Sequence, residues 1–275
     1  MAKLPKHRYT PTFLCICAFV LLLLFVRLCV DVIFVIRKPT KGKHMNATVT
    51  AVANQKGGSG KTSVAIEVAT ALTLRANAKV LVIDGDPQHG LIDWRADREE
   101  TLPPLFPVIG FPSSKLPVEI DAHKPNYDHI IIDAPPHNAS ILRAAAACSN
   151  GMLIPVQPSK HDIRGTRAFV AMVQEALSFN PDLKAAFVIN RRITGTALGR
   201  DIFTALEDFP FPTFHTVLGQ RIAFAEAHGF GLSVMEHQPL DPKAVSEVEE
   251  LVIELLEMLN DAEQKNSTRK QASHA

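Results

Sequence analysis

Residues 54–63 read NQKGGSGKTS, and this stretch decides the fold that the rest of the chain is expected to adopt. It matches the end of the phosphate-loop pattern G-x-x-x-x-G-K-[ST], in which backbone N–H groups surround phosphate, the lysine reaches the β and γ oxygens and the hydroxyl holds Mg²⁺. Lys61 and Thr62 would take the last two roles. The glycines that supply backbone freedom in the loop are Gly57, Gly58 and Gly60.

The loop departs from the general pattern in two places. The first glycine of the pattern lies five positions before the second, and here that position is Gln55. The loop also carries a second lysine, Lys56, which the pattern does not require. The loop is therefore a variant, and Lys56 needs an explanation of its own.

Short apolar runs alternate with helix-length segments along the body of the chain. Strands are expected at 48–54, 79–84, 107–111, 129–133, 151–156 and 185–190, with a further short run at 216–218. Helices are expected at 62–75, 115–122, 138–147, 162–178 and 241–260. Because the strand runs are almost continuously hydrophobic, they are typical of strands buried on both faces. The predicted fold is α/β, a mostly parallel twisted sheet with helices on both faces.

The charge of the 275-residue chain is unevenly distributed. Residues 1–44 hold eight Lys/Arg and one acid, which leaves 21 Lys/Arg and 27 Asp/Glu in residues 45–275. The mildly acidic body argues against a constitutively basic nucleic-acid binder, so any DNA contact would need a local patch. Cysteine usage indicates a reducing compartment, because Cys148 is alone in the body and the other three lie before residue 30.

The first 44 residues form an apolar N-terminal extension with three interpretations. The apolar run 13–26 is too short to span a membrane, and continuing it to 36 includes Arg27 and Asp31. The three interpretations are translation that begins at Met45, a membrane anchor at 13–36, and a buried segment. Either of the first two leaves the body in the cytoplasm, free or at the cytoplasmic face of the membrane.

Carboxylates follow two of the predicted strands. Asp84 ends one strand with Asp86 two residues beyond it, and Asp133 ends another. In parallel sheets the ligand lies at the carboxyl ends of the strands, and an apolar run followed by Asp holds Mg²⁺ in phosphate-loop proteins. A lone aspartate there could equally cap a helix, but three of them beside the loop favour a site.

These motifs resemble the ParA/MinD group of ATPases with a deviant Walker A loop. The segment KGGSGKT is similar to the K-G-G-x-G-K-[ST] of that group, and DGDPQ is similar to the D-x-D-P-Q of its ParA branch. The likeness continues through DPQHGLIDW, PVQPSKHD and TVLGQRIAFAEAHGFGLSVME, and is greatest to small, ParF-like partition ATPases. It covers Thr48–Leu259, which implies an ATPase domain at 45–262 followed by a polar tail, 263–275, expected to be disordered. Ser63, in place of the commoner second threonine, and the extension are departures.

The resemblance implies a role for each matching residue. Lys56 would reach the ATP of a partner subunit across a dimer, which makes it catalytic together with Lys61 and Asp86. The residues implied in ATP binding are Lys56, Gly57, Gly58, Ser59, Gly60, Lys61, Thr62, Ser63 and, by a weaker likeness, Asn190. The residues implied in Mg²⁺ binding are Thr62, Asp84 and Asp133. Arg221 lies in a segment similar to one that binds DNA nonspecifically, although an ordinary solvated arginine is an equal alternative; Arg191, Arg192 and Arg200 are further candidates.

The implied function is DNA partitioning by an ATP-dependent homodimer. The dimer would bind DNA without sequence preference, associate with the nucleoid, and be released when a centromere-binding, ParB/ParG-like adaptor stimulates hydrolysis. Two alternatives stay open: an accessory ATPase for conjugative DNA transfer, and a MinD-like positioning ATPase at the membrane. The second is disfavoured because EVEELVIELLEML in the last helix is acidic and would be repelled by anionic lipid.

Overall fold

The computed structural model describes residues 47–100 and 102–272 of the chain. The predicted extension at 1–44, its alternative anchor at 13–36 and the alternative start at Met45 lie outside these residues. Within the described ranges, no helix is both long and apolar enough to cross a membrane.

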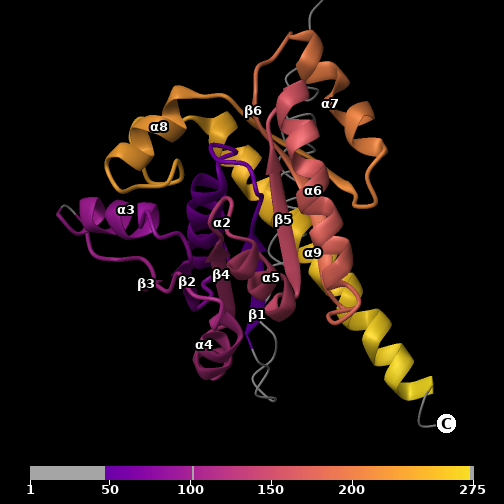
Figure 1. Cartoon of the computed structure of the whole chain (residues 1–275). Helices are drawn as coiled ribbons and strands as arrows, with labels where there is room; N and C mark the ends of the chain where they lie inside the picture. The colour runs from indigo at the N-terminus through magenta and orange to yellow at the C-terminus, as the bar shows by residue number, and fades with distance from the viewer. Residues whose placement is uncertain (1–46, 101, 273–275) are drawn as a thin grey trace, which may run out of the picture. The chain divides into compact units, whose positions relative to one another are not determined.

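The described residues build a seven-stranded sheet in the order β3-β2-β4-β1-β5-β6-β7, and every pair of neighbouring strands is parallel. The strands are β1 (Thr48–Val52), β2 (Val80–Asp84), β3 (Val108–Gly110), β4 (His129–Asp133), β5 (Gly151–Val156), β6 (Lys184–Arg192) and β7 (Thr213–Gly219). The predicted parallel sheet is confirmed. The strand that leads into the phosphate loop, β1, lies between β4 and β5 near the middle of the sheet (Figure 1).

Helices cover both faces of the sheet, as predicted. One face packs against α4 (Leu116–His123), α5 (Ala139–Cys148), α6 (Lys160–Ala176) and α7 (Ala197–Glu207). The other packs against α2 (Lys61–Ala76), α3 (Gly90–Glu99), α8 (Ile222–Gly229) and α9 (Pro242–Ala272), and a 3₁₀ turn, η1, occupies Lys124–Asn126. Successive strand residues alternate between the two cores: in β4, Ile130 and Ile132 face one and Ile131 the other. This alternation explains why the strands read as uninterrupted apolar runs.

Three helices were missed by the sequence reasoning: α3, α7 and α8. Charged residues make up half of α3 and leave no clear apolar period there. In α7 the apolar residues Leu198, Ile202 and Leu206 do recur at helical spacing, and the sequence reasoning overlooked them. The eight residues of α8 contain just one buried position, Ala227. An apolar period therefore does not predict the short helices α3 and α8.

The last helix, α9, is longer than expected. It continues to Ala272, so most of the segment 263–275, expected to be a disordered tail, is helical. No proline or glycine follows residue 260 to end the helix, and the alanine, glutamate, glutamine and lysine there favour helix. The prediction of disorder was based on polarity alone, which does not distinguish a solvated helix from a disordered tail.

Carboxylates of α9 cover the exposed edge of the sheet at β7. Glu254 accepts hydrogen bonds from the backbone N–H groups of His215 (2.8 Å) and Thr216 (2.6 Å) and from the Thr216 hydroxyl. Glu247, two turns earlier, accepts one from the N–H of Gly219 at 3.0 Å. An open edge strand is a template for pairing with another chain, and these contacts block part of it.

We therefore predict that Glu254→Ala lowers the free energy of unfolding by about 2 kcal/mol, because the buried Thr216 loses the acceptor of two of its donors. Chemical denaturation would measure the change. Glu257→Ala is the control, since Glu257 is exposed on the same helix and should shift stability by less than about 0.5 kcal/mol. Equal effects of the two variants would contradict the role of Glu254.

Candidate nucleotide-binding site

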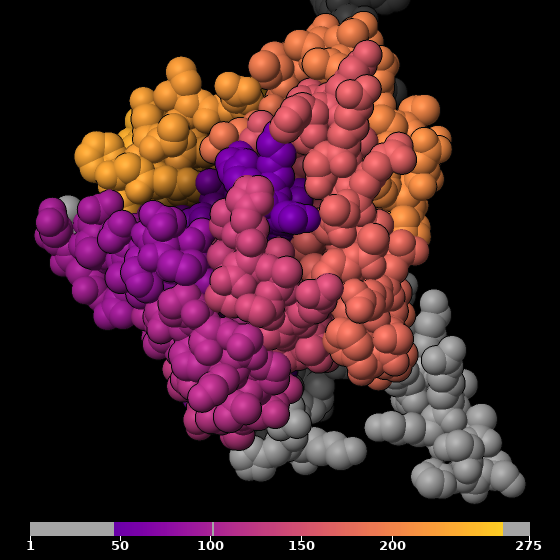
Figure 2. Space-filling model, viewed as in Figure 1, coloured from indigo at the N-terminus to yellow at the C-terminus, as the bar shows by residue number. Residues whose placement is uncertain are grey.

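The predicted phosphate loop connects β1 to α2 at the carboxyl edge of the sheet. The strand register places Asp133 beside Val52 at the end of β1, and Asp84 beside Asp133. The loop and two of the three predicted carboxylates therefore meet at one edge, where parallel sheets bind ligands. In the space-filling view, the indigo segment that contains the loop reaches the surface between the orange region of α8 and the pink region of α6 (Figure 2).

The backbone of the loop is held in a conformation that needs glycine. Gly58 and Gly60 have φ of +78° and +90°, in the left-handed region. Gly60 is also crowded, because a Cβ there would lie 2.0 Å from Nδ2 of Asn190. Two side chains brace the loop from outside: Asn190 donates to the carbonyl of Ser59 (3.0 Å), and Gln157 donates to that of Gly58 (2.5 Å).

Lys61 lies within the loop, as the motif predicts. Its ammonium donates to the carbonyl of Lys56 at 3.0 Å, and the residue is 6 % exposed. Burial lowers the pKa of Lys61, and the nearby Asp133 and Asp86 oppose that shift. A buried cation beside a glycine-rich loop is suited to the negative charge of a polyphosphate.

Thr62 and Asp133 form the pair expected at a magnesium site. The Thr62 hydroxyl donates to Oδ2 of Asp133 at 2.6 Å, while Oδ1 of Asp133 is buried and has no hydrogen-bond partner. Burial raises the pKa of Asp133 to about 7, although the Thr62 hydrogen bond acts to lower it. An orphaned carboxylate oxygen beside a hydroxyl fits Mg²⁺, which takes few protein ligands and completes its shell with water and phosphate oxygens. Consistent with this, residues 47–100 and 102–272 hold no cluster of three or more His, Cys, Asp or Glu that could bind a metal unaided.

Asp84 accepts hydrogen bonds from backbone N–H groups with both of its carboxylate oxygens. Its Oδ1 accepts the N–H of Asp86 (3.0 Å), and its Oδ2 accepts those of Leu91 (3.1 Å) and Ile92 (3.2 Å) at the start of α3. Burial raises the pKa of Asp84, and these backbone hydrogen bonds act to lower it. Asp84 therefore caps the start of α3, the alternative that the sequence reasoning set aside, and its predicted part in holding Mg²⁺ stays a prediction. Of the two carboxylates, Asp133 is the one with an oxygen that has no hydrogen-bond partner among the described residues.

Asp86 lies beyond the strand end and is partly exposed. Its Oδ1 accepts the N–H of Gln88 at 3.0 Å, which shapes the turn into α3. It is close enough to Lys61 and Asp133 to act on the charges of both. The position agrees with the predicted part in handling the attacking water, which stays a prediction.

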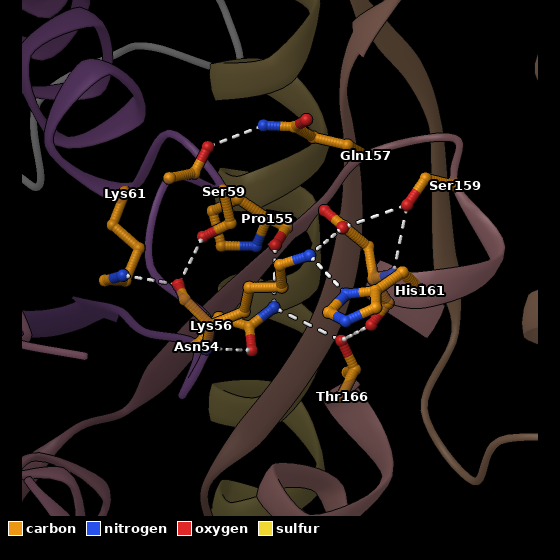
Figure 3. Close-up of polar contacts among 11 residues, drawn as sticks. Asn54, Lys56, Ser59, Lys61, Pro155, Gln157, Ser159, His161 and Thr166 are labelled. Carbon is orange, nitrogen blue, oxygen red and sulfur yellow. Dashed lines mark hydrogen bonds and ion pairs between the residues drawn. The ribbon is translucent and has the colours of Figure 1, made fainter. Parts of the chain in front are cut away.

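The second lysine, Lys56, points away from its own loop (Figure 3). Its ammonium pairs with Asp162 on α6 and lies 2.8 Å from Nδ1 of His161. Asp162 is buried and is held by Ser159, whose hydroxyl donates to Oδ1 at 3.0 Å. The backbone of Lys56 is anchored too, because its N–H donates to Oδ1 of Asn54 at 3.2 Å. The segment PVQPSKHD, which carries part of the family resemblance, ends with Asp162, but the sequence did not identify Asp162 as the partner of Lys56.

A pocket of about 390 Å³ adjoins the phosphate loop between α2, β6 and α8. Ser63 and Asn190, both predicted to bind ATP, line it, as does Arg221. The amide of Asn190 is already used, since it donates to Ser59 and accepts the N–H of Arg191 at 2.9 Å. Asn190 therefore contacts the loop while it lines the pocket, and a base that entered the pocket would lie beside its side chain.

Arg221, the predicted DNA contact, is paired. It forms a two-pronged hydrogen bond with Glu247, its Nη1 lies 3.9 Å from Asp241, and its side chain is 25 % exposed. The hydrogen bond to Glu247 raises the pKa of Arg221 further. Arg191 and Arg200 are exposed instead, and Arg192 is half-buried. Arg221 at the pocket is thus neutralised by Glu247, whereas Arg191 and Arg200 are cations that solvent can reach.

The two loop glycines Gly60 and Gly57 give a matched test of this geometry. We predict that Gly60→Ala lowers the free energy of unfolding by at least ~2 kcal/mol, because alanine is strained at φ +90° and displaces Asn190. Gly57→Ala should cost less than about 0.5 kcal/mol, since a Cβ there meets nothing within 4 Å. Denaturation without nucleotide would compare them, and equal stabilities would rule out the crowding described at Gly60.

Comparison with known proteins agrees with this geometry. Residues 50–234 match the CobQ/CobB/MinD/ParA nucleotide binding domain. The chain is 30 % identical over 219 residues to maintenance of carboxysome distribution protein A of Halothiobacillus neapolitanus, covering 76 % of this chain and 97 % of that protein. It is 31 % identical over 226 residues to the chromosome-partitioning ATPase Soj of Thermus thermophilus, covering 70 % and 90 %.

Solved structures show the same fold. The septum site-determining protein MinD of Pyrococcus horikoshii, complexed with Mg-ADP, aligns with a TM-score of 0.60 at 20 % identity, covering 76 % of this chain and 96 % of that one. An Asp→Ala variant of Cyanothece McdA in complex with ATP aligns at 0.59 and 18 % identity, covering 79 % and 98 %. With the family match, the phosphate loop and its two lysines, the chain belongs to the CobQ/CobB/MinD/ParA nucleotide-binding family as a ParA-type ATPase.

Proposed function

We propose that this chain is a DNA-partitioning ATPase. ATP closes a homodimer, the dimer binds DNA without sequence preference, and hydrolysis stimulated by a centromere-binding adaptor releases it. The proposal places the protein in the cytoplasm in association with the nucleoid. It is supported by the relatives, one of which is a chromosome-partitioning ATPase, and by the arrangement of the two lysines.

The observation that carries the proposal is the separation of Lys56 from Lys61. Lys61 lies inside the loop, whereas the ammonium of Lys56 is directed outward to Asp162 and His161. A lysine that served its own nucleotide would have no reason to leave the glycine-rich ring. Lys56 is instead placed to exchange one anionic partner, Asp162, for another, the phosphates held by a second subunit.

Hydrolysis would divide among the remaining groups as follows. The N–H groups of the loop and Lys61 hold the phosphates, and Asp86 orients the attacking water. Thr62 and Asp133 hold Mg²⁺, which when bound neutralises charge on the β- and γ-phosphates. Lys56 of the partner subunit stabilises charge that develops on the transferred phosphoryl group, which makes hydrolysis depend on the dimer.

Nonspecific DNA binding would rest on cations near β6 and α8. Arg191 and Arg200 are exposed, and Arg221 would join them after release from Glu247. Contacts of this kind neutralise phosphates, so the affinity would fall steeply with salt and carry no base preference.

A second candidate function is the positioning of a protein assembly. It is favoured by the likeness over 97 % of its length to a protein that maintains carboxysome distribution. Positioning at a membrane is less well supported, because the apolar face of α9 is buried in the core. Val248, Leu251 and Leu255 of that face pack there and are not exposed to lipid. An adaptor that binds a specific DNA site would favour partitioning, and one that binds only protein would favour the second candidate.

The central test removes the charge of Lys56. We predict that Lys56→Gln leaves ATP binding by the monomer within about threefold of the native value, because Lys61 still serves the subunit's own nucleotide. ATP-dependent dimerisation should be lost, since the partner's phosphates lose their counter-charge. Light scattering with and without ATP and Mg²⁺ would measure the dimer, and an unchanged ATP-induced dimer would exclude the cross-subunit role.

Asp162→Asn is the matched control for this variant. It breaks the same ion pair but leaves the ammonium of Lys56 in place, so the ATP-dependent dimer should persist. Asp86→Ala completes the set, because it should retain the dimer while hydrolysis falls by on the order of 10²-fold. Loss of the dimer in Asp162→Asn would mean that dimerisation needs the ion pair between Lys56 and Asp162. It would not then depend on contact of Lys56 with the partner's phosphates.

The part played by Arg221 in DNA binding can be tested through its partner. We predict that Glu247→Gln strengthens binding to unrelated DNA sequences, because glutamine still accepts the N–H of Gly219 but no longer neutralises Arg221. Adding Arg221→Ala should reverse the gain and reduce the salt dependence by about one phosphate contact. If Glu247→Gln leaves DNA affinity and its salt slope unchanged, Arg221 serves only to attach α8 to α9.

A further inference from the structure

A fully buried carboxylate in α2 has no part in the proposed hydrolysis. Glu67 is 0 % exposed and accepts three hydrogen bonds. Oε1 accepts from Nε2 of His228 at 2.8 Å and from the N–H of Val234 at 3.3 Å, and Oε2 accepts from the hydroxyl of Ser233 at 2.5 Å. All three donors belong to the end of α8 and the segment that follows it.

The position of Glu67 would ordinarily favour an apolar residue. Its neighbours on α2, Ile66 and Val68, are buried in the core, and an unpaired carboxylate there would be costly. Glu67 also lies one helical turn after Ser63, and both residues line the pocket beside the phosphate loop. The helix that begins with Lys61 thus carries a polar anchor at the inner end of that pocket.

That anchor contacts α8, the short helix that forms one side of the pocket. Four residues of α8 line the pocket: Ile222, Phe224, Ala225 and His228. Within α8, Ala227 is buried and Ala223 and Phe224 pack partly buried against the core, whereas Ile222 is 75 % exposed. Polar contacts hold its two ends: Arg221 joins the first to Glu247, and His228 joins the last to Glu67.

We propose that Glu67 and His228 are positioning residues for the base of the bound nucleotide. Their hydrogen bond fixes α8 as the wall of the pocket against which the base packs. It also fixes the position of that wall relative to α2, the helix whose first turn holds the phosphates. The inference rests on the proposed function in so far as that requires ATP in this site. It predicts that the pair governs affinity for a ligand with a base and has no effect on a ligand made of phosphate alone.

The experiment compares ATP with inorganic tripolyphosphate by calorimetry at saturating Mg²⁺. His228→Leu, which removes the donor but keeps bulk, should weaken ATP binding about tenfold and leave tripolyphosphate binding within about twofold. His228→Gln should recover most of the ATP affinity, because its amide N–H can donate to Glu67. His228 is the position of choice since its side chain is 18 % exposed, so these variants disturb the core less than a change at Glu67.

Thr70→Val is the control on the same helix. Thr70 is buried, and its hydroxyl has no hydrogen-bond partner among the residues that the structure describes, so both affinities should stay at the native values. Thermal unfolding of each variant without ligand would show that it is folded.

Three outcomes would overturn the inference. If His228→Leu binds ATP as the native protein does, or loses ATP and tripolyphosphate alike, the pair does not position the base. If His228→Gln fails to recover ATP affinity, the hydrogen bond to Glu67 is not the cause. Native protein that binds neither ligand would overturn the proposed function as well, which separates that failure from the first two.

Discussion

The burial of charge at the carboxyl edge of the sheet is the constraint on which the site depends. Lys61, Asp84 and Asp133 are each no more than 6 % exposed, at the ends of neighbouring strands or directly after the loop. Charges in such surroundings persist only when each has a compensating partner. Asp84 finds its partners in backbone N–H groups and Lys61 in a carbonyl, whereas Asp133 keeps one oxygen orphaned. The partnerless oxygen of Asp133 is the feature of this edge that fits a cation.

Residues from elements that are distant in sequence contact the phosphate loop and the pocket beside it. Asn190 on β6 holds the carbonyl of Ser59, and Asp162 on α6 holds the side chain of Lys56. Glu67 on α2 holds the end of α8 beside the pocket. Contacts to the loop and the pocket therefore come from elements on both faces of the sheet.

Prediction from sequence succeeded where the signal was periodic or local. Strands at 129–133 and 151–156 were predicted at their observed bounds, because strands buried on both faces are uninterrupted apolar runs. It failed for α8, whose eight residues include one fully buried position, and it set aside the helix cap that Asp84 forms. A strand-terminal aspartate looks the same in sequence whether it caps a helix or approaches a metal, and only the positions of the N–H groups of Leu91 and Ile92 distinguish the two.

The sequence by itself determined the parallel sheet and the phosphate loop, because uninterrupted apolar runs and a short motif each depend on neighbouring residues alone. The tertiary structure alone decided where the side chain of Lys56 points and which groups contact Glu67. Lys56 and Asp162 are 106 positions apart, and Glu67 and His228 are 161 apart. Partners at such separations are chosen by the packing of whole helices on the sheet, and no local pattern in either segment records that choice.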